Sequence, residues 1–173
     1  MIFRYKIKKL KKKGIKYLYI QIKCFKFAKV MSKEKTPYCK CLYYSANALA
    51  RVITKIAEEE FAAVNLAPSY AFVVMTINKK PGIQSGELAE IMMLTPSTVT
   101  RLVDKLISQN LLKKHTEGRT VLIYPTQLSV ELYPQITLAW SKIYKRYIDI
   151  LGEDFAAKLT DDIYLSAIKL EKT

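Results

Sequence analysis

The sequence has few of the residues on which catalysis and metal or phosphate binding depend. Its 173 residues include one histidine, His115, and three cysteines, two of them at Cys39 and Cys41. One histidine supports no Ser-His-Asp or Cys-His arrangement, and the five glycines are too scattered for a phosphate-binding loop. A Cys-x-Cys pair with a single histidine also falls short of the four ligands of a structural zinc site. We therefore expect a protein that is not an enzyme and that binds neither a metal nor a cofactor.

Long apolar runs are absent as well. No stretch reaches the roughly 18 apolar residues that a membrane-spanning helix needs. Lysines interrupt the apolar positions of the N-terminal segment, which leaves no apolar region typical of a secretory signal. An odd number of cysteines predicts no disulfide framework and favours a reducing compartment. These absences predict a cytoplasmic protein with no membrane partner.

The positive charge of the chain is concentrated at its N-terminus. The formal net charge is +14, and residues 1–30 contain eleven of the 29 lysines and arginines and no acidic residue. Residues 31–173 carry the other 18 basic residues against 15 acidic ones. Two interpretations of residues 1–30 stay open: a basic arm that contacts phosphates or an anionic surface, or translated sequence upstream of a natural start at Met31. The functional argument therefore rests on residues 31–173.

Apolar residues at helical spacing predict a mainly α-helical chain. The predicted helices cover residues 38–64, 68–77, 85–93, 96–110, 127–151 with an interruption at Pro134, and the segment from Gly152 to Leu170. Ser85 is expected to cap the third of them, and Thr95 followed by Pro96 to start the fourth.

Two short β-prone runs follow the fourth predicted helix. They cover residues 111–116 and 120–124, and Gly118 lies in the turn between them, which predicts a β-hairpin. Helices 85–93 and 96–110 with this hairpin behind them have the order of a winged helix-turn-helix. The expected fold is therefore mainly α with a small β-wing.

The residue types on this unit favour contact with duplex DNA. Helix 96–110 places its apolar residues on one face, which leaves hydroxyl and basic residues together with Asp104 on the outer face. Arg101 is the candidate for bidentate recognition of guanine, and the helix N-terminus favours phosphate. Arg119, beside the wing tip, is the candidate for a minor-groove or phosphate contact. The predicted DNA-binding residues are Ser85, Thr95, Ser97, Thr98, Thr100, Arg101, Lys105, Lys113, Lys114 and Arg119.

Residues 85–126, SGELAEIMMLTPSTVTRLVDKLISQNLLKKHTEGRTVLIYPT, resemble the winged helix-turn-helix of MarR-type regulators. The resemblance is carried by Leu94-Thr95-Pro96-Ser97-Thr98-Val99-Thr100-Arg101-Leu102-Val103 and by the basic wing with Arg119. It extends over residues 38–172, although the flanking helices are generic. The wing tip, residues 115–119, looks shorter than is usual in the family.

The resemblance implies a single domain over residues 31–173 with a winged helix-turn-helix over 68–126. It implies dimerisation helices at about 38–64 and 127–171. It also implies a homodimeric repressor on a pseudo-palindromic operator, released by a small ligand or an oxidant. A helical protein-protein interaction module without DNA binding is the alternative, and such a module should show an apolar or acidic stripe on the outer face of helix 96–110.

Two kinds of control are suggested for such a regulator. The run Cys39-x-x-Leu42-Tyr43 is similar to the segment around the reactive cysteine of the family's hydroperoxide-sensing branch, so Cys39 and Cys41 are candidate redox sensors. The alternative interpretation is two small, semi-buried cysteines without a role. A crevice for a small aromatic or apolar effector is the other expectation, with Tyr43, Tyr44, Tyr70 and Phe72 as candidate lining residues, although packing alone also explains these aromatic residues.

Overall fold

The computed structural model describes residues 36–171 of the chain. The chain divides into two compact units at residues 48 and 49, and the structure describes residues 36–48 of the first unit and 49–171 of the second. Residues 1–35, to which the expectation of a basic arm applies, lie outside the described residues.

The described part of the first unit is a turn followed by the start of helix α2 (Leu42–Phe61). The carbonyl of Cys41 accepts the first helical hydrogen bond, from the amide of Ser45 at 3.0 Å. The rings of Tyr38 and Tyr44 are 5.6 Å apart. The helix expected from residue 38 therefore begins four residues later, because residues 37–40 form a turn.

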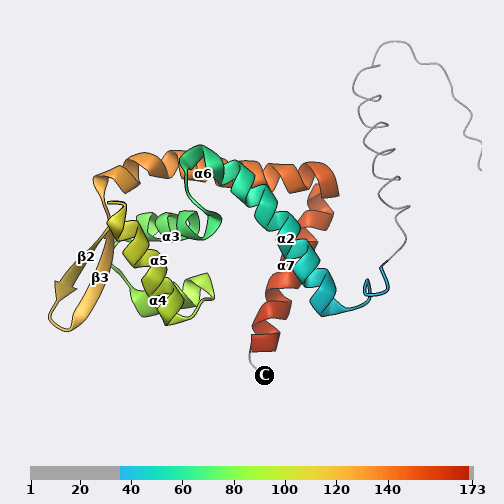
Figure 1. Cartoon of the computed structure of the whole chain (residues 1–173), viewed down its shortest axis with the longest axis horizontal. Coiled ribbons are helices and arrows are strands. Elements are labelled where there is room, and N and C mark those ends of the chain that lie inside the picture. The colour runs from blue at the N-terminus through green and yellow to red at the C-terminus, as the bar shows by residue number, and fades with distance from the viewer. Residues whose placement is uncertain (1–35, 172–173) are drawn as a thin grey trace, which may run out of the picture. The chain divides into compact units, whose positions relative to one another are not determined.

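The second unit contains the rest of α2 and a helical bundle with one small sheet (Figure 1). The elements that follow are η1 (Ala62–Val64), α3 (Pro68–Lys79), β1 (Ile83–Gln84), α4 (Ser85–Met92), α5 (Pro96–Ser108), β2 (Leu112–Glu117), β3 (Thr120–Pro125), α6 (Gln127–Leu151) and α7 (Glu153–Glu171). The β2–β3 hairpin projects away from α3, α4 and α5 (Figure 1). The fold is therefore mainly α with a β-wing, as expected.

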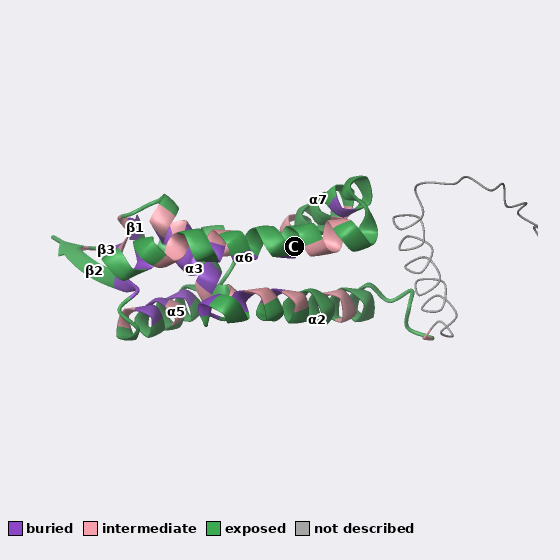
Figure 2. Ribbon diagram, turned by 90° about the horizontal axis from the view of Figure 1, so that it is seen from above, coloured by how far each residue is buried: buried purple, intermediate pink, exposed green. Residues whose placement is uncertain are grey.

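Helix α3 lies at the centre of the core. Its sequence is almost wholly apolar, and Ala71, Val73, Val74 and Ile77 are fully buried. A helix that is apolar on every face is stable only when other elements surround it. The elements that pack on α3 include α4, α5, β3 and α6. Figure 2 shows buried residues concentrated in this region and largely exposed ones along α7.

The sheet has three antiparallel strands in the order β1-β3-β2, one more than expected. The additional strand, β1, is two residues long and pairs Ile83 with Ile123. Gly82 precedes it with φ at +82°, and a Cβ added there would lie 3.0 Å from the hydroxyl of Tyr124. Glycine is therefore required at this turn both by its backbone conformation and by the close approach of the tyrosine.

Two expectations about helix ends and interruptions are wrong. Gln84, not Ser85, is the N-cap of α4, and Ser85 is the first helical residue. Pro134 lies inside α6, which continues through it. A proline in a helix interior costs about 3 kcal/mol or more. Burial of Ile136 and Ala139 directly after Pro134 holds the helix on the core and offsets that cost.

No single described helix is long and apolar enough to cross a membrane. Residues 42–64 and 68–79 meet the requirements of length and composition only together, as a bent pair. Much of the apolar surface of α3 is buried in the core.

Candidate nucleic-acid interface

Helices α4 and α5 form a helix-turn-helix around a three-residue turn. Met93 ends α4 in the left-handed conformation with φ at 51°, and the amide of Leu94 donates to the carbonyl of Ala89 at 3.0 Å. Leu88 of α4 and Val99 of α5 are both fully buried. The turn and the shared core therefore fix α5 relative to α4.

Helix α5 has a sharp division between a core face and an outer face. Val99, Val103 and Leu106 are buried. The exposed residues are hydroxyl-bearing or charged: Ser97, Thr98, Thr100, Arg101, Asp104 and Lys105. Within the described chain, neither Arg101 nor Lys105 forms an ion pair. The alternative interaction module should show an apolar stripe on the outer face of α5. The outer face carries no such stripe.

The start of α5 is organised by Thr95, as the sequence predicts. The Thr95 hydroxyl accepts a hydrogen bond from the amide of Thr98 at 3.3 Å and lies 3.1 Å from the hydroxyl of Ser97. Pro96 occupies the first turn of the helix, where no partner for a backbone N–H is needed. The Thr100 hydroxyl donates to the carbonyl of Pro96 at 2.9 Å, which leaves its oxygen lone pairs available to accept. The Thr98 hydroxyl lies 2.9 Å from that of Thr95, so four of the candidate hydroxyls are held in place by local hydrogen bonds.

The wing separates its two lysines onto opposite faces. Lys114 pairs with the buried Ile123 of β3, whereas Lys113 pairs with Tyr124. Neighbouring residues of a strand point to opposite faces. Lys114 lies toward α5, where its Nζ is 2.6 Å from Oδ1 of Asp104. Lys113 therefore projects from the opposite face of the hairpin and cannot pair with Asp104.

The wing tip is a two-residue turn. Glu117 pairs with Thr120, and Gly118 between them has φ at 60°. A glycine with positive φ at the first turn position is typical of a tight hairpin. Arg119 occupies the second turn position and is exposed. His115 Nε2 lies 3.8 Å from Oε1 of Glu117, on the same side of the hairpin as Lys113.

The candidate sensor cysteines are both exposed and free. Cys41 directly precedes α2, while Cys39 lies in the turn before it. Cys39 and Tyr43 therefore do not belong to one helical turn. The reason is that α2 begins only at Leu42.

The four aromatic residues expected to line an effector pocket belong to different units. Tyr43 and Tyr44 lie in the first unit, and Tyr70 and Phe72 in the second. Tyr70 packs against the hydrophobic core. The ring of Phe72 contacts the buried Phe61 edge to face, with 6.0 Å between the ring centres.

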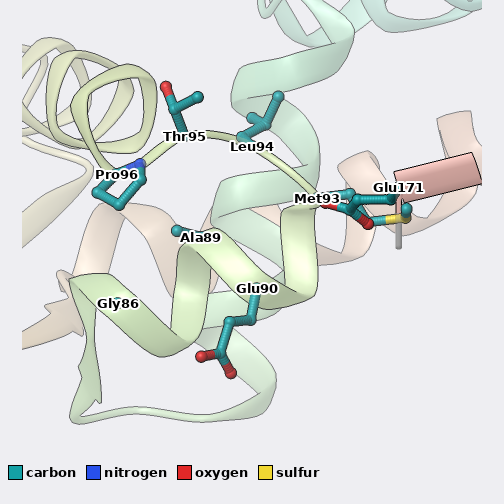
Figure 3. Close-up of a pocket in the computed structure, with 8 residues that line it drawn as sticks. All are labelled: Gly86, Ala89, Glu90, Met93, Leu94, Thr95, Pro96 and Glu171. Carbon is teal, nitrogen blue, oxygen red and sulfur yellow. The ribbon is translucent and has the colours of Figure 1, made fainter. Parts of the chain in front are cut away.

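An open hollow, which no feature of the sequence predicts, lies beside the helix-turn-helix turn (Figure 3). Its lining residues are Gly86, Ala89, Glu90, Met93, Leu94, Thr95, Pro96 and Glu171. Figure 3 shows the side chain of Glu90 extending away from Thr95 and Pro96. The hollow adjoins the N-terminus of α5. The Glu90 carboxylate is not directed at that end of the helix.

An arginine ties α6 to the C-terminal half of α2. Arg146 donates to Oε2 of Glu59 at 2.8 Å and to Oε1 of Glu60 at 2.9 Å. These hydrogen bonds raise the pKa of its guanidinium above the usual value. Burial, followed by the neighbouring Tyr144, raises the pKa of the adjacent Tyr147.

No group of three or more metal-ligating side chains occurs in residues 36–171.

The helix-turn-helix and the hairpin behind it together define a winged-helix fold. The sequence model of the MarR family matches residues 66–117, from two residues before α3 to the end of β2. The fold of the described residues is similar to that of solved MarR-type regulators.

Several solved structures share this fold at low sequence identity. The transcriptional repressor CouR, bound to a 23-mer DNA duplex, matches with a TM-score of 0.71 and 17% identity over 79% of this chain and 99% of CouR. CouR has also been solved bound to p-coumaroyl-CoA. The PcaV regulator from Streptomyces coelicolor, in complex with its natural ligand, matches with a TM-score of 0.69 and 20% identity over 78% of this chain and 96% of PcaV.

The oxidised form of MarR from E. coli matches with a TM-score of 0.58 and 18% identity over 79% of this chain and 96% of MarR. No match was found among curated protein sequences. The family and these structural relatives are transcriptional regulators and not enzymes, in agreement with the expectation from the sequence.

Proposed function

We propose that the protein is a transcriptional repressor that binds a pseudo-palindromic operator as a homodimer. The observation that carries the proposal is the outer face of α5, where Arg101, Lys105 and four hydroxyl groups near the helix start are exposed opposite a fully buried core face. A helix with this distribution can enter the major groove while its other face stays packed. CouR, which has the same fold, has been solved on a DNA duplex.

Each part of the interface has its own role in this proposal. Arg101 reads guanine by two parallel hydrogen bonds, and the hydroxyls at the start of α5 contact phosphates or base edges. Lys113 and Arg119 extend from the wing to the backbone or the minor groove. Ser85 and Lys105 add phosphate contacts. Lys114 acts mainly within the protein, because its ammonium group is already paired with Asp104.

Exposed apolar side chains on the last helix support a homodimer. Ala156 is the only buried residue of α7. Ile163 and Leu165 are 45% and 51% exposed, and further large apolar residues of the helix are exposed as well. An exposed apolar surface of this kind normally marks an interface, and in a symmetric dimer the same helix contributes from both copies. The operator would then carry two half-sites related by the same symmetry.

Release from DNA is proposed to follow the binding of a small aromatic or apolar effector or the oxidation of a cysteine. CouR and PcaV have each been solved with a small ligand, and MarR in an oxidised form. The candidate residues here remain Tyr43, Tyr44, Tyr70 and Phe72 for the effector and Cys39 and Cys41 for oxidation. Either event would act by favouring a conformation in which the two copies of α5 no longer match the half-site spacing.

The test uses duplexes selected from a random pool by the full chain and fluorescence-anisotropy titration of two charge-matched variants. Arg101→Ala should weaken binding to the selected sequence by about tenfold or more, since a bidentate contact to a base contributes about 1–3 kcal/mol of discrimination. Lys158→Ala removes one positive charge from the exposed surface of α7, next to Asp162, and should leave affinity almost unchanged. Equal binding by Arg101→Ala and the parent would contradict the assigned reading face, and the absence of any binding would favour the interaction module.

A further inference from the structure

The C-terminus of α5 is closed by backbone hydrogen bonds of a defined motif. Asn110 follows the helix in the left-handed conformation with φ at 60°. Its amide donates to the carbonyl of Ile107 at 2.9 Å, and the amide of Leu111 donates to the carbonyl of Leu106 at 3.0 Å. This pair of bonds defines a Schellman ending, which satisfies the carbonyls of the last turn but leaves those of Asn110 and Leu111 in need of other partners.

Thr126 supplies those partners. Its hydroxyl donates to the carbonyl of Asn110 at 2.6 Å and approaches that of Leu111 at 3.1 Å, and its backbone amide also donates to Leu111 at 3.1 Å. The same hydroxyl oxygen accepts from the amide of Ser129 at 3.2 Å and so caps α6. One side chain therefore joins the segment directly after the end of α5 to the first turn of α6. We call this set of bonds the Thr126 junction.

The junction lies where three elements meet. The end of α5, the base of the β2–β3 hairpin and the start of α6 come together in one place (Figure 1). Leu112 pairs with Pro125 at the base of the hairpin, one residue inward from the junction on each strand. Helix α5, which is the proposed recognition helix, the β2–β3 hairpin and helix α6 are thus attached to one another at the Thr126 junction.

A second polar contact attaches the start of α6 to the core without involving α5. Ser129 is fully buried, and its hydroxyl accepts a hydrogen bond from Nδ2 of Asn78 in α3 at 2.8 Å. Asn78 also donates to the carbonyl of Val74 within α3 at 2.9 Å. The start of α6 is therefore held twice, to α3 through Ser129 and to α5 through Thr126.

We propose that Thr126 is a positioning residue that fixes the direction of α5 relative to α6, so that a movement of α6 is passed to the recognition helix. This proposal rests on the proposed DNA-binding function. Helix α5 has 13 residues and is about 20 Å long at 1.5 Å per residue. A tilt of about 10° at the junction would displace its N-terminal end by about 3 Å, which is as long as a hydrogen bond.

Three substitutions separate this role from simple stabilisation. Thr126→Val keeps the shape of the side chain but removes the hydroxyl from both α5 and α6. Thr126→Ser retains the hydroxyl and should rescue the geometry. Ser129→Ala removes the buried hydrogen bond to Asn78 and serves as the matched control, because it weakens the attachment of α6 without touching α5. Thr126→Val and Ser129→Ala should each lower the melting temperature, whereas only the first should change the direction of α5.

The direct measurement is the distance between α5 and α6 in the DNA-free protein. Spin labels at Lys105→Cys and Lys142→Cys, in the full chain with its three natural cysteines replaced by serine, report this distance by pulsed electron resonance. Dilution with unlabelled protein isolates distances within one chain. Thr126→Val should shift or broaden the distribution, while Thr126→Ser and Ser129→Ala should reproduce that of the parent. An unchanged distribution in Thr126→Val, or an equal change in Ser129→Ala, would overturn the proposal.

The affinity of the unlabelled variants for a selected duplex then tests transmission to DNA. Thr126→Val should bind about tenfold more weakly than the parent, the effect of roughly one lost hydrogen bond, and Thr126→Ser should bind like the parent. Equal affinity of Thr126→Val and the parent would overturn the positioning role in binding. If the parent itself bound no duplex, the proposed function would be wrong, whereas the distance measurement would still decide the role of Thr126.

Discussion

The segment from α3 to β3 and the final helix α7 differ in how much of their apolar surface the chain itself covers. In the first, Val73, Val99 and Ile123 from three different elements are buried in one core. In α7, Ala156 is the only buried residue, and Ile163 and Leu165 are exposed. The segment from α3 to β3 thus covers its apolar surface within one copy of the chain, whereas α7 has the exposed apolar surface on which the proposed homodimer rests.

The largest effect should come from opening the core of the first region. Leu106→Ala removes a fully buried side chain from the core face of α5. We expect the free energy of unfolding to fall by about 2–5 kcal/mol, from lost burial and the cavity that remains. Urea denaturation at a fixed protein concentration measures this change. A loss below about 1 kcal/mol would mean that α5 is not held by the core as described.

A negative charge introduced on the exposed apolar surface of α7 tests whether a second copy of the chain covers that surface. Leu165→Glu should weaken self-association by about 30-fold or more if this residue lies at the centre of a dimer interface. The helical content should stay unchanged, because the side chain is exposed within one chain. Analytical ultracentrifugation over a range of concentrations measures the effect, with Lys158→Ala as the control on the same helix. A dimer as tight as that of the parent would place the interface elsewhere.

A smaller effect is expected from the two wing lysines, which the structure distinguishes. Lys113→Met should reduce the slope of log affinity against log salt by about one, as the loss of one phosphate contact does. Lys114→Met should change the slope less, because its ammonium group is 2.6 Å from Asp104. Titrations of a selected duplex at several salt concentrations compare the two variants. Identical slopes would contradict the different roles assigned to the two faces of the hairpin.

The smallest effect concerns the attachment of α6 to α2. Arg146→Gln removes both ion pairs, with Glu59 and with Glu60, from a partly exposed site. The melting temperature should fall slightly at low salt, and the difference should shrink as salt is raised because exposed charges are screened. Thermal unfolding at two salt concentrations checks this. A loss as large as that of Leu106→Ala would show that α6 depends on this contact more than on its apolar face.

Features encoded by neighbouring residues could be predicted from the sequence. Thr95-Pro96 marked the start of α5, and Gly118 marked the hairpin turn, because capping and turn formation depend on the residues at the site itself. The apolar spacing of α5 likewise separated its core face from its outer face. The same local signals supported the winged-helix fold and its resemblance to the MarR family.

Features that depend on contacts between distant segments could not be predicted. Strand β1 has only two residues and exists through its pairing with β3. The pairing of Lys114 with Asp104 depends on which face of β2 lies toward α5. Thr126 had a local signal as a helix cap, since a threonine precedes α6, but its bond to Asn110 joins residues 16 positions apart. Pro134 carried a misleading signal, since burial of the residues after it outweighs the local cost of proline.

Selection of duplexes from a random pool tests whether the exposed face of α5 reads DNA. The full chain would be equilibrated with the pool at low and at moderate salt, and the bound fraction sequenced. We expect enrichment of an inverted repeat with half-sites about one helical turn apart, and an affinity that falls steeply as salt rises. Binding without any sequence enrichment, or no binding at low salt, would contradict this expectation.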